Sequence, residues 1–381
     1  MMKKLSFIIP LLLCLMSFDA AAQWYLFDIT PEEKKDSTKA KAADTYRDGH
    51  LNLGLMLPLR SKTDKPNSNF LDLYSGALMA VREIADSTGL EIDLKVSDTT
   101  DPDTPVSDLA VNSCDINIGP ISVNDIREAL AVCNSDRYIV SPLDPKAADL
   151  LMDGNLIQTP SSWQSLIDEM ILWLREETAP SHEVVVLMDN SEAGKGEQTN
   201  YLLNSLRWSG IRYVTVEALN EDAFSNKKDY KIIIASDSDG FITPNLKNIA
   251  ALATKFPNIT LFCTSRIRSS SGMNLNDLYY ANARLTAPYH IDYNDPAVKD
   301  FILKYRALFQ TEPSSFSFQG YDTVHFFGFL FWKYGKDWAE RLSDYSEDGL
   351  QSGFRFTSGS RYNTAVRRVI YNRNLTTTLQ K

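Results

Sequence analysis

From residue 51 onward, short apolar segments alternate with amphipathic segments of helical length. The first part of this alternation predicts strands over 51–57, 91–96, 115–118 and 138–140, with helices over 70–87 and 121–133. Strands separated by helices pair in parallel through right-handed crossovers, because a right-twisted strand feeds its helix back onto the sheet in that hand. Residues 51–160 therefore predict a doubly wound α/β unit.

The alternation stops at Pro160 and then begins again. Ser161 or Ser162 is placed to cap a helix, and the segments that follow predict strands over 184–188, 213–216, 231–235 and 259–263, with helices over 197–208 and 245–255. A last section from 285 predicts helices over 296–309 and 322–334. A length of 381 residues suits two domains of about 100–200 residues each. The restart therefore predicts a second doubly wound unit.

The N-terminus has the pattern of a secretory signal peptide over residues 1–22. Lys3 and Lys4 precede an apolar run, and the small residues 20–22 suit cleavage. The rival interpretation is a lipoprotein signal that uses Cys14, but Leu13 stands where such a signal needs a small residue. We therefore expect a periplasmic protein without a lipid anchor, and a polar linker over 23–50. The mature chain is expected to contain no membrane span.

Charge and cysteine content limit the possible partners and cross-links of the chain. The chain has 39 Lys+Arg against 49 Asp+Glu and a net charge of -10, which argues against a nucleic-acid partner. Three cysteines remain after residue 22, namely Cys114, Cys133 and Cys263. Cys114 and Cys133 precede consecutive predicted strands, so both a disulfide between them and two buried free thiols stay open.

The sequence contains none of the spacings that catalysis or metal binding requires. Its four histidines are far apart, and there is no Cys-x-x-Cys and no Gly-x-Ser-x-Gly. The segment Gly194–Lys195–Gly196 lacks the spacing of a phosphate-binding loop and the Ser or Thr after its lysine. We therefore predict no cofactor, no metal site and no enzyme activity.

Several segments, in order along the chain, resemble type 1 periplasmic binding proteins of the leucine/isoleucine/valine-binding kind. They are LNLGLMLPL, FLDLYSGALMAVREI, DINIGPISVNDI, YIVSPLDP, VVVLMDNSEAGKGEQTNYLLNSLRWSG and FILKYRALFQTEPSSFSFQGYDTVHFFGFLFWKYG. The C-terminal segment GLQSGFRFTSGSRYNTAVRRVIY resembles a Bacteroidetes-type branch of that family. The resemblance covers about residues 50–371.

The resemblance implies an α/β fold of two doubly wound parallel-sheet lobes joined by three crossing segments, which we place near 158–162, 284–290 and 345–356. It implies lobe 1 over 51–160 completed by about 285–345, lobe 2 over 161–284, and a C-terminal hinge strand and hairpin over 346–381. It also implies a small-molecule ligand held between closing lobes and an ABC permease as partner.

Open α/β sheets bind ligands outside the carboxyl ends of their strands, so the strand ends supply the candidate site. The ligand-binding candidates are Asp98, Gly119, Ile121, Ser122, Ser141, Leu143, Asp189 and Asp237, with Tyr321 added by the resemblance. Gly119 would let the backbone approach a ligand, and the helix after Ser122 would favour a carboxylate. For Ser122, Ser141 and Asp98, a purely structural role as cap or turn residue stays open.

In amino-acid binders of the family, Ser/Thr-rich loops of lobe 1 hold the α-carboxylate, and an acid of lobe 2 meets the ammonium. Asp237 or Asp189 would be that acid. The lobe-1 loops of this chain contain few hydroxyl groups, which argues against specificity for amino acids. The ligand is expected to be amino-acid-like or cell-wall-derived. The alternative function is a ligand-free regulator of cell-envelope synthesis that uses the same fold to bind a cell-envelope protein.

Overall fold

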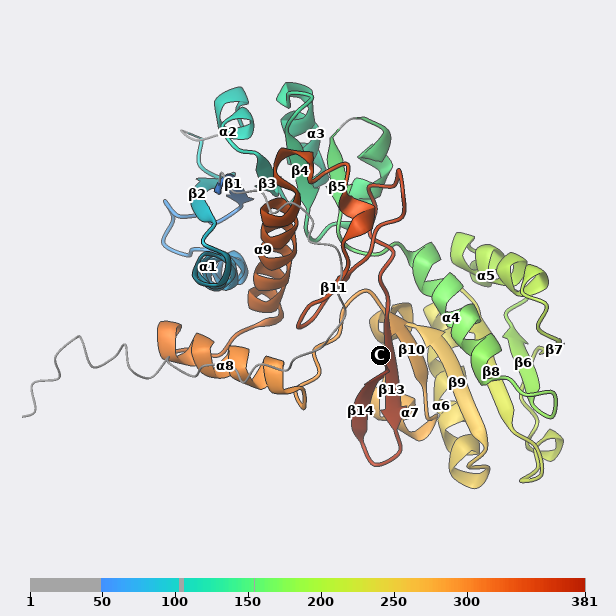
Figure 1. Ribbon diagram of the computed structural model, residues 1–381. Helices are drawn as coiled ribbons and strands as arrows, with labels where there is room; N and C mark the ends of the chain where they lie inside the picture. Colours follow the sequence, from blue (N-terminus) through green and yellow to red (C-terminus); the bar gives the residue numbers. More distant parts are fainter. Residues whose placement is uncertain (1–48, 103–105, 154, 381) are drawn as a thin grey trace, which may run out of the picture. The chain divides into compact units, whose positions relative to one another are not determined.

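The computed structural model describes residues 49–102, 106–153 and 155–380 (Figure 1). The predicted signal peptide and nearly all of the predicted linker lie outside these ranges. Among the described residues, none of the helices combines the length and the apolar character that a membrane crossing requires.

The first sheet is built as the alternation predicts. Its five strands are all parallel, in the order β2-β1-β3-β4-β5. They are β1 (His50–Leu57), β2 (Glu91–Asp98), β3 (Ile116–Ile118), β4 (Tyr138–Ser141) and β5 (Leu156–Gln158). One face is covered by α1 (Ser68–Thr88) and α9 (Ser315–Tyr334), and the other by α2 (Asp108–Asn112), α3 (Val123–Val132) and η2 (Pro145–Asp153). We call this sheet and its helices the first lobe.

Helix α9, the last long helix of the chain, packs against α1, the first. A Cβ on Gly76 would collide with the carbonyl of Ser317, and one on Gly320 with the carbonyl of Leu73, so the two helices approach backbone to backbone. The helix begins earlier than the predicted 322 because Ser314 and Ser317 form a capping box. Its aromatic residues Phe326, Phe327 and Phe331 pack in the first core, so this helix is part of the interior of the lobe.

The second sheet has seven strands in the order β14-β13-β10-β9-β8-β6-β7. They are β6 (Glu183–Met188), β7 (Tyr213–Val216), β8 (Tyr230–Ala235), β9 (Ile259–Thr264), β10 (Arg284–Ala287), β13 (Arg367–Asn372) and β14 (Thr376–Gln380). α4 (Trp163–Glu177) and α5 (Glu197–Trp208) cover one face, and α6 (Asp239–Lys255) and α7 (Leu275–Tyr280) the other. Strands β13 and β14 are antiparallel additions, and β13 pairs with β10. We call this sheet and its helices the second lobe.

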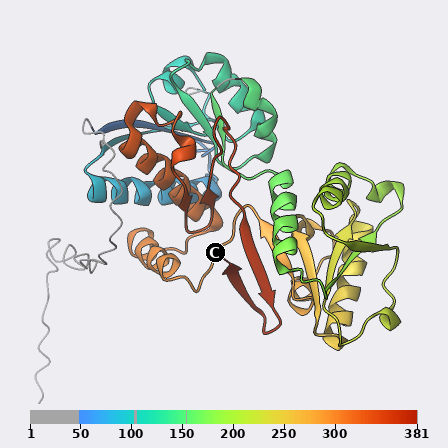
Figure 2. The same ribbon diagram turned by 45° about the vertical axis from the view of Figure 1, so that its right-hand side comes forward.

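The chain passes between the two sheets three times, as the resemblance implies. The first crossing runs from β5 to α4, and the second from β10 to α8 (Pro296–Phe309), which packs with α1 and α9. The third runs from β12 (Gly353–Phe354) to β13, and β12 pairs with β11 (Glu347–Asp348). Figure 2 shows the result, in which each lobe combines segments from distant parts of the sequence. The third crossing lies after 356 rather than at 345–356, because Phe354 and Phe356 still pack in the first core.

A buried polar network fastens the crossing segments. The carboxylate of Asp322 on α9 accepts hydrogen bonds from the backbone N–H groups of Leu350, Gln351 and Ser352, each at 2.8 Å. Burial raises the pKa of Asp322 to about 6, although those N–H groups favour the charged form. Arg367 at the start of β13 donates to the carbonyls of residues 349, 351 and 352. The ends of the third crossing are therefore tied to α9.

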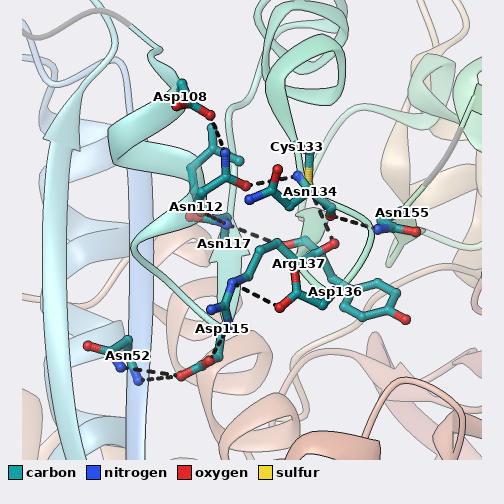
Figure 3. Close-up of polar contacts among 12 residues, drawn as sticks. Asn52, Asp108, Asn112, Asp115, Asn117, Cys133, Asn134, Asp136, Arg137 and Asn155 are labelled. Carbon is teal, nitrogen blue, oxygen red and sulfur yellow. Dashed lines mark hydrogen bonds and ion pairs between the residues drawn. The ribbon is translucent and has the colours of Figure 1, made fainter.

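The amino ends of the first-sheet strands carry a second polar cluster (Figure 3). Arg137 pairs with Asp115, whose other oxygen accepts a hydrogen bond from the backbone N–H of Asn52 at 3.0 Å. The thiol of Cys133 donates to the carbonyl of Arg137. This cluster joins β1, β3 and β4 at the edge opposite the candidate site, so its role is structural.

The cysteines of the described residues are free thiols, so the possible bridge between Cys114 and Cys133 is not formed. Burial raises the pKa of Cys133 to about 11 and that of Cys263 to about 12. The thiolate is the reactive form of cysteine, so both side chains are held in their unreactive state at neutral pH.

Candidate functional site

The strand orders locate one crevice in each lobe. In the first sheet the direction of winding reverses between β1 and β3, and in the second between β6 and β8. Ligands of open α/β sheets bind at such points, outside the carboxyl ends of the strands. We call these two regions the first edge and the second edge.

Asp98, at the end of β2, holds the loop that follows β1. Its carboxylate accepts hydrogen bonds from the backbone N–H groups of Leu59, Arg60 and Ser61 and from the hydroxyl groups of Ser61 and Thr100. Burial opposes ionisation of this carboxyl, but the bonds from Thr100 and Ser61 outweigh it and lower its pKa. Asp98 is thus engaged within the first lobe.

Gly119, after β3, closes the first crevice with its own backbone. Its φ is +88°, and a Cβ would collide with the carbonyl of Met56 on β1. Its N–H donates to the carbonyl of Val140 at 2.8 Å. Glycine is required here by the conformation and by the contact with β1.

Ser122 and Ser141 are used differently. Ser122 is the N-cap of α3, and its hydroxyl accepts a hydrogen bond from the N–H of Asp125 at 3.2 Å. Ser141 is 0% exposed, and its carbonyl accepts hydrogen bonds from the N–H and hydroxyl of Thr159. The hydroxyl oxygen of Ser141 has no hydrogen-bond partner in the part of the chain that the structure describes.

The remaining candidates of the first edge are apolar. Ile121 and Leu143 are half-buried and pack against the first core. Phe70 and Phe316 pack against the same core and meet edge to face, with ring centroids 5.7 Å apart. Helix α1 follows β1 and α9 runs beside it in the same direction, so both phenylalanines stand near the carboxyl ends of the strands.

At the second edge the structure brings together the loops that carry the two predicted acids, because Ser236 bonds to Asp189 and the N–H of Asp237 donates to the carbonyl of Gly194. Asp189, after β6, is 5% exposed and accepts hydrogen bonds from the hydroxyl of Ser236 at 2.7 Å and the N–H of Ser191 at 3.0 Å. Burial opposes the ionisation of Asp189, and these serines outweigh it, so its pKa is lowered. Asp237, after β8, accepts from the N–H groups of Gln198 and Thr199 and from the hydroxyl of Thr199.

The loop over 191–196 explains why these acids are enclosed. A Cβ on Gly194 would collide with the carboxylate of Asp189, and one on Gly196 with that of Asp237. The backbone of Gly194–Lys195–Gly196 therefore packs directly against two carboxylates, which would repel a phosphate.

A small hollow of about 60 Å³ lies beside Asp237, between α4, α5 and the ends of β8 and β9. Its walls are mostly apolar and include Ile167, Met170, Leu202, Ile242, Phe262 and Ile267. Arg266 also lines it and pairs with Asp239 at 2.9 Å. The sequence interpretation missed Arg266, although it follows the predicted strand 259–263 and the strand-end rule extends to it.

Tyr321 lies apart from the other candidates. Its hydroxyl donates to Glu83 on α1 at 2.8 Å, and its ring meets Phe301 of α8 with centroids 5.0 Å apart. These contacts place it among the helices that cover the first sheet. Within the described ranges, no three His, Cys, Asp or Glu side chains gather as a metal site would require.

Comparisons with known proteins bear on the fold. No family model and no curated protein matches the sequence. A Rhodospirillum rubrum protein assigned to branched-chain amino acid ABC transport matches with a TM-score of 0.61 and 15% identity, over 87% of this chain and 100% of that one. A leucine-bound ABC transporter substrate-binding protein of Desulfitobacterium hafniense matches at 0.49 and 16%, over 87% and 100%. A Rhodopseudomonas palustris solute-binding protein with 3,4-dihydroxybenzoic acid matches at 0.45 and 14%, over 84% and 92%.

Two doubly wound sheets, three crossings and the likeness to the Rhodospirillum rubrum protein define the class of fold. The chain has the fold of type 1 periplasmic binding proteins, as its sequence resemblance implies. The narrower resemblance to a Bacteroidetes-type branch stays a prediction.

Proposed function

We propose that the protein is an exported solute-binding receptor that captures a small molecule between its two lobes and delivers it to an ABC-type permease. The observation that carries the proposal is the pair of strand-end edges on two lobes joined by three crossings. In this arrangement closure about the crossings can bury a ligand on both sides. The role is binding rather than catalysis, since the candidate side chains form no nucleophile–base pair.

A thermal-shift screen of the purified protein tests the proposal. The compounds should include amino acids, short peptides, cell-wall fragments and uncharged organic molecules. A ligand at a hundredfold excess over its dissociation constant stabilises the folded state by about 2.7 kcal/mol. A fall in the radius of gyration with the same compound would show lobe closure.

Site specificity is checked with two leucines. Leu143→Asp alters the first edge and is expected to abolish the shift. Leu303→Asp changes a side chain on α8 that is 63% exposed and is expected to preserve it. If no compound in the broad screen changes the melting temperature, the receptor proposal is wrong.

One observation favours the alternative, a ligand-free regulator of cell-envelope synthesis. The hollow of about 60 Å³ at the second edge is small beside ligand pockets, which usually have about 300–1,000 Å³. A chain that binds no small molecule but forms a stable complex with a purified cell-envelope protein would support this function.

A further inference from the structure

The charged groups at the two edges are already engaged by the protein's own donors and acceptors. Asp189 has two hydrogen-bond donors and Asp237 has three. At the second edge, Arg266 donates to Asp239, to the carbonyl of Asp237 and to the hydroxyl of Ser270. Its positive charge is balanced within the lobe.

This engagement leaves poor partners for an ammonium group. Asp189 is buried, and the backbone of Gly194 lies against its carboxylate, so a ligand cannot reach it from that side. Asp237 holds the first turn of α5, and the backbone of Gly196 lies against the same carboxylate. An ammonium that is buried without a partner loses hydration free energy that nothing at this edge replaces.

The first edge is also poorly suited to a carboxylate, since the unpartnered hydroxyl of Ser141 is 0% exposed. The N–H of Gly119 is used by Val140, and the hydroxyl of Ser122 caps α3. Asp125 adds a negative charge in the first turn of α3, which opposes an anion at that helix N-terminus. What this edge offers instead is the half-buried apolar surface of Ile121 and Leu143, which pack against the same core as the phenylalanines at the starts of α1 and α9.

We propose that the ligand is an uncharged, predominantly apolar small molecule and not a zwitterionic amino acid. This inference rests on the proposed receptor function. The ligand's apolar body would contact Ile121 and Leu143 at the first edge, and only one end of it would reach the small hollow beside Ile167 and Leu202 at the second. Burial of apolar surface would supply most of the affinity.

A matched series of probes that share the 3-methylbutyl group tests the inference by calorimetric titration of the full protein. The probes are leucine, which is zwitterionic, 4-methylpentanoic acid, which is an anion, 3-methylbutylamine, which is a cation, and 4-methylpentanamide, which is uncharged. A parallel pair is phenylalanine and 3-phenylpropanamide. The uncharged amide is expected to bind at least about tenfold more tightly than the amino acid of the same skeleton.

Two variants locate the contact. Leu143→Asn is expected to weaken amide binding about tenfold, while Leu143→Met, which keeps the apolar volume, should leave it within about threefold. Leu303→Asn on α8 is the control for a general effect of the substitution. Circular dichroism confirms that each variant is folded.

The outcomes separate this inference from the function on which it rests. Tighter binding of leucine or phenylalanine than of the matching amide overturns the inference and supports the receptor function. If only a compound outside the series binds, an uncharged compound supports the inference. A charged or zwitterionic compound overturns it. If no compound binds at all, the receptor function fails and the inference fails with it.

Discussion

The two lobes end their strands in different ways, although both are doubly wound. At the first edge one carboxylate, Asp98, collects its donors from the loop after β1, and the neighbouring loops present Ile121 and Leu143. At the second edge two carboxylates, Asp189 and Asp237, lie on neighbouring loops and are both in contact with a glycine-containing loop. The difference teaches that an acid at a strand end is a ligand contact only when its oxygens are not needed by the loops around it.

The largest expected effect comes from removing the acceptor of the first edge. Asp98→Ala should lower the free energy of unfolding by about 3–5 kcal/mol, because several hydrogen-bond donors lose a buried, charged acceptor. Urea denaturation measures the change. Asp93→Ala, at an exposed position on the same strand, is the control and should cost no more than about 0.5 kcal/mol. An equal cost for both variants would show that Asp98 does not hold its loop.

The next effect concerns the close contact at the first crevice. Gly119→Ala should cost about 2–4 kcal/mol, because it adds a collision with the Met56 carbonyl to an unfavourable φ. Gly210→Ala is the matched control, since Gly210 has a φ of +75° and open space around it. That variant should cost only about 1 kcal/mol. Thermal unfolding distinguishes the two, and equal costs would contradict a steric role for Gly119.

At the second edge a smaller effect is expected. Asp237→Ala should destabilise the protein by about 1–2 kcal/mol, the usual contribution of a side chain that caps a helix. The comparison would be wrong if Asp237→Ala cost more than Asp98→Ala. Asp222→Ala, at an exposed position of the same lobe, serves as its control in chemical denaturation and should be neutral.

The smallest effect is a difference in acid sensitivity. The pKa values of Asp98 and Asp189 are lowered in the folded protein, so both carboxyls add stability above their unfolded pKa, and this stability is lost as the pH falls below it. Asp98 has more donors, so Asp98→Asn should reduce the loss of stability between pH 5 and pH 3 more than Asp189→Asn does. Unfolding curves at both pH values test this, and the reverse order would contradict it.

Much of the fold could be predicted from the sequence because strand and helix periods are local properties. The strands over 51–57 and 259–263 correspond to β1 and β9, and the restart after Pro160 precedes α4. The third crossing was placed too early because Phe354 and Phe356 resemble any apolar strand until their packing in the first core is known. The start of α9 was missed because a capping box that ends in serine gives a weak signal in the sequence.

The candidate site was only partly within reach of the sequence. The strand-end rule selected Asp98, Asp189 and Asp237, and all three lie at carboxyl ends of strands. The same rule would have found Arg266 had it been applied to β9. It could not reveal which oxygens are occupied, because the donors come from residues up to 47 positions away, as in the bond from Ser236 to Asp189.

The sequence by itself determined the alternation of strands and helices and thus two parallel-sheet lobes, because these depend on the period of apolar residues along each segment. Only the tertiary structure decided that the acids at the strand ends are engaged, that Gly119 closes against β1, and that the first edge is apolar. These properties depend on contacts between segments far apart in the chain, and no local pattern encodes such contacts.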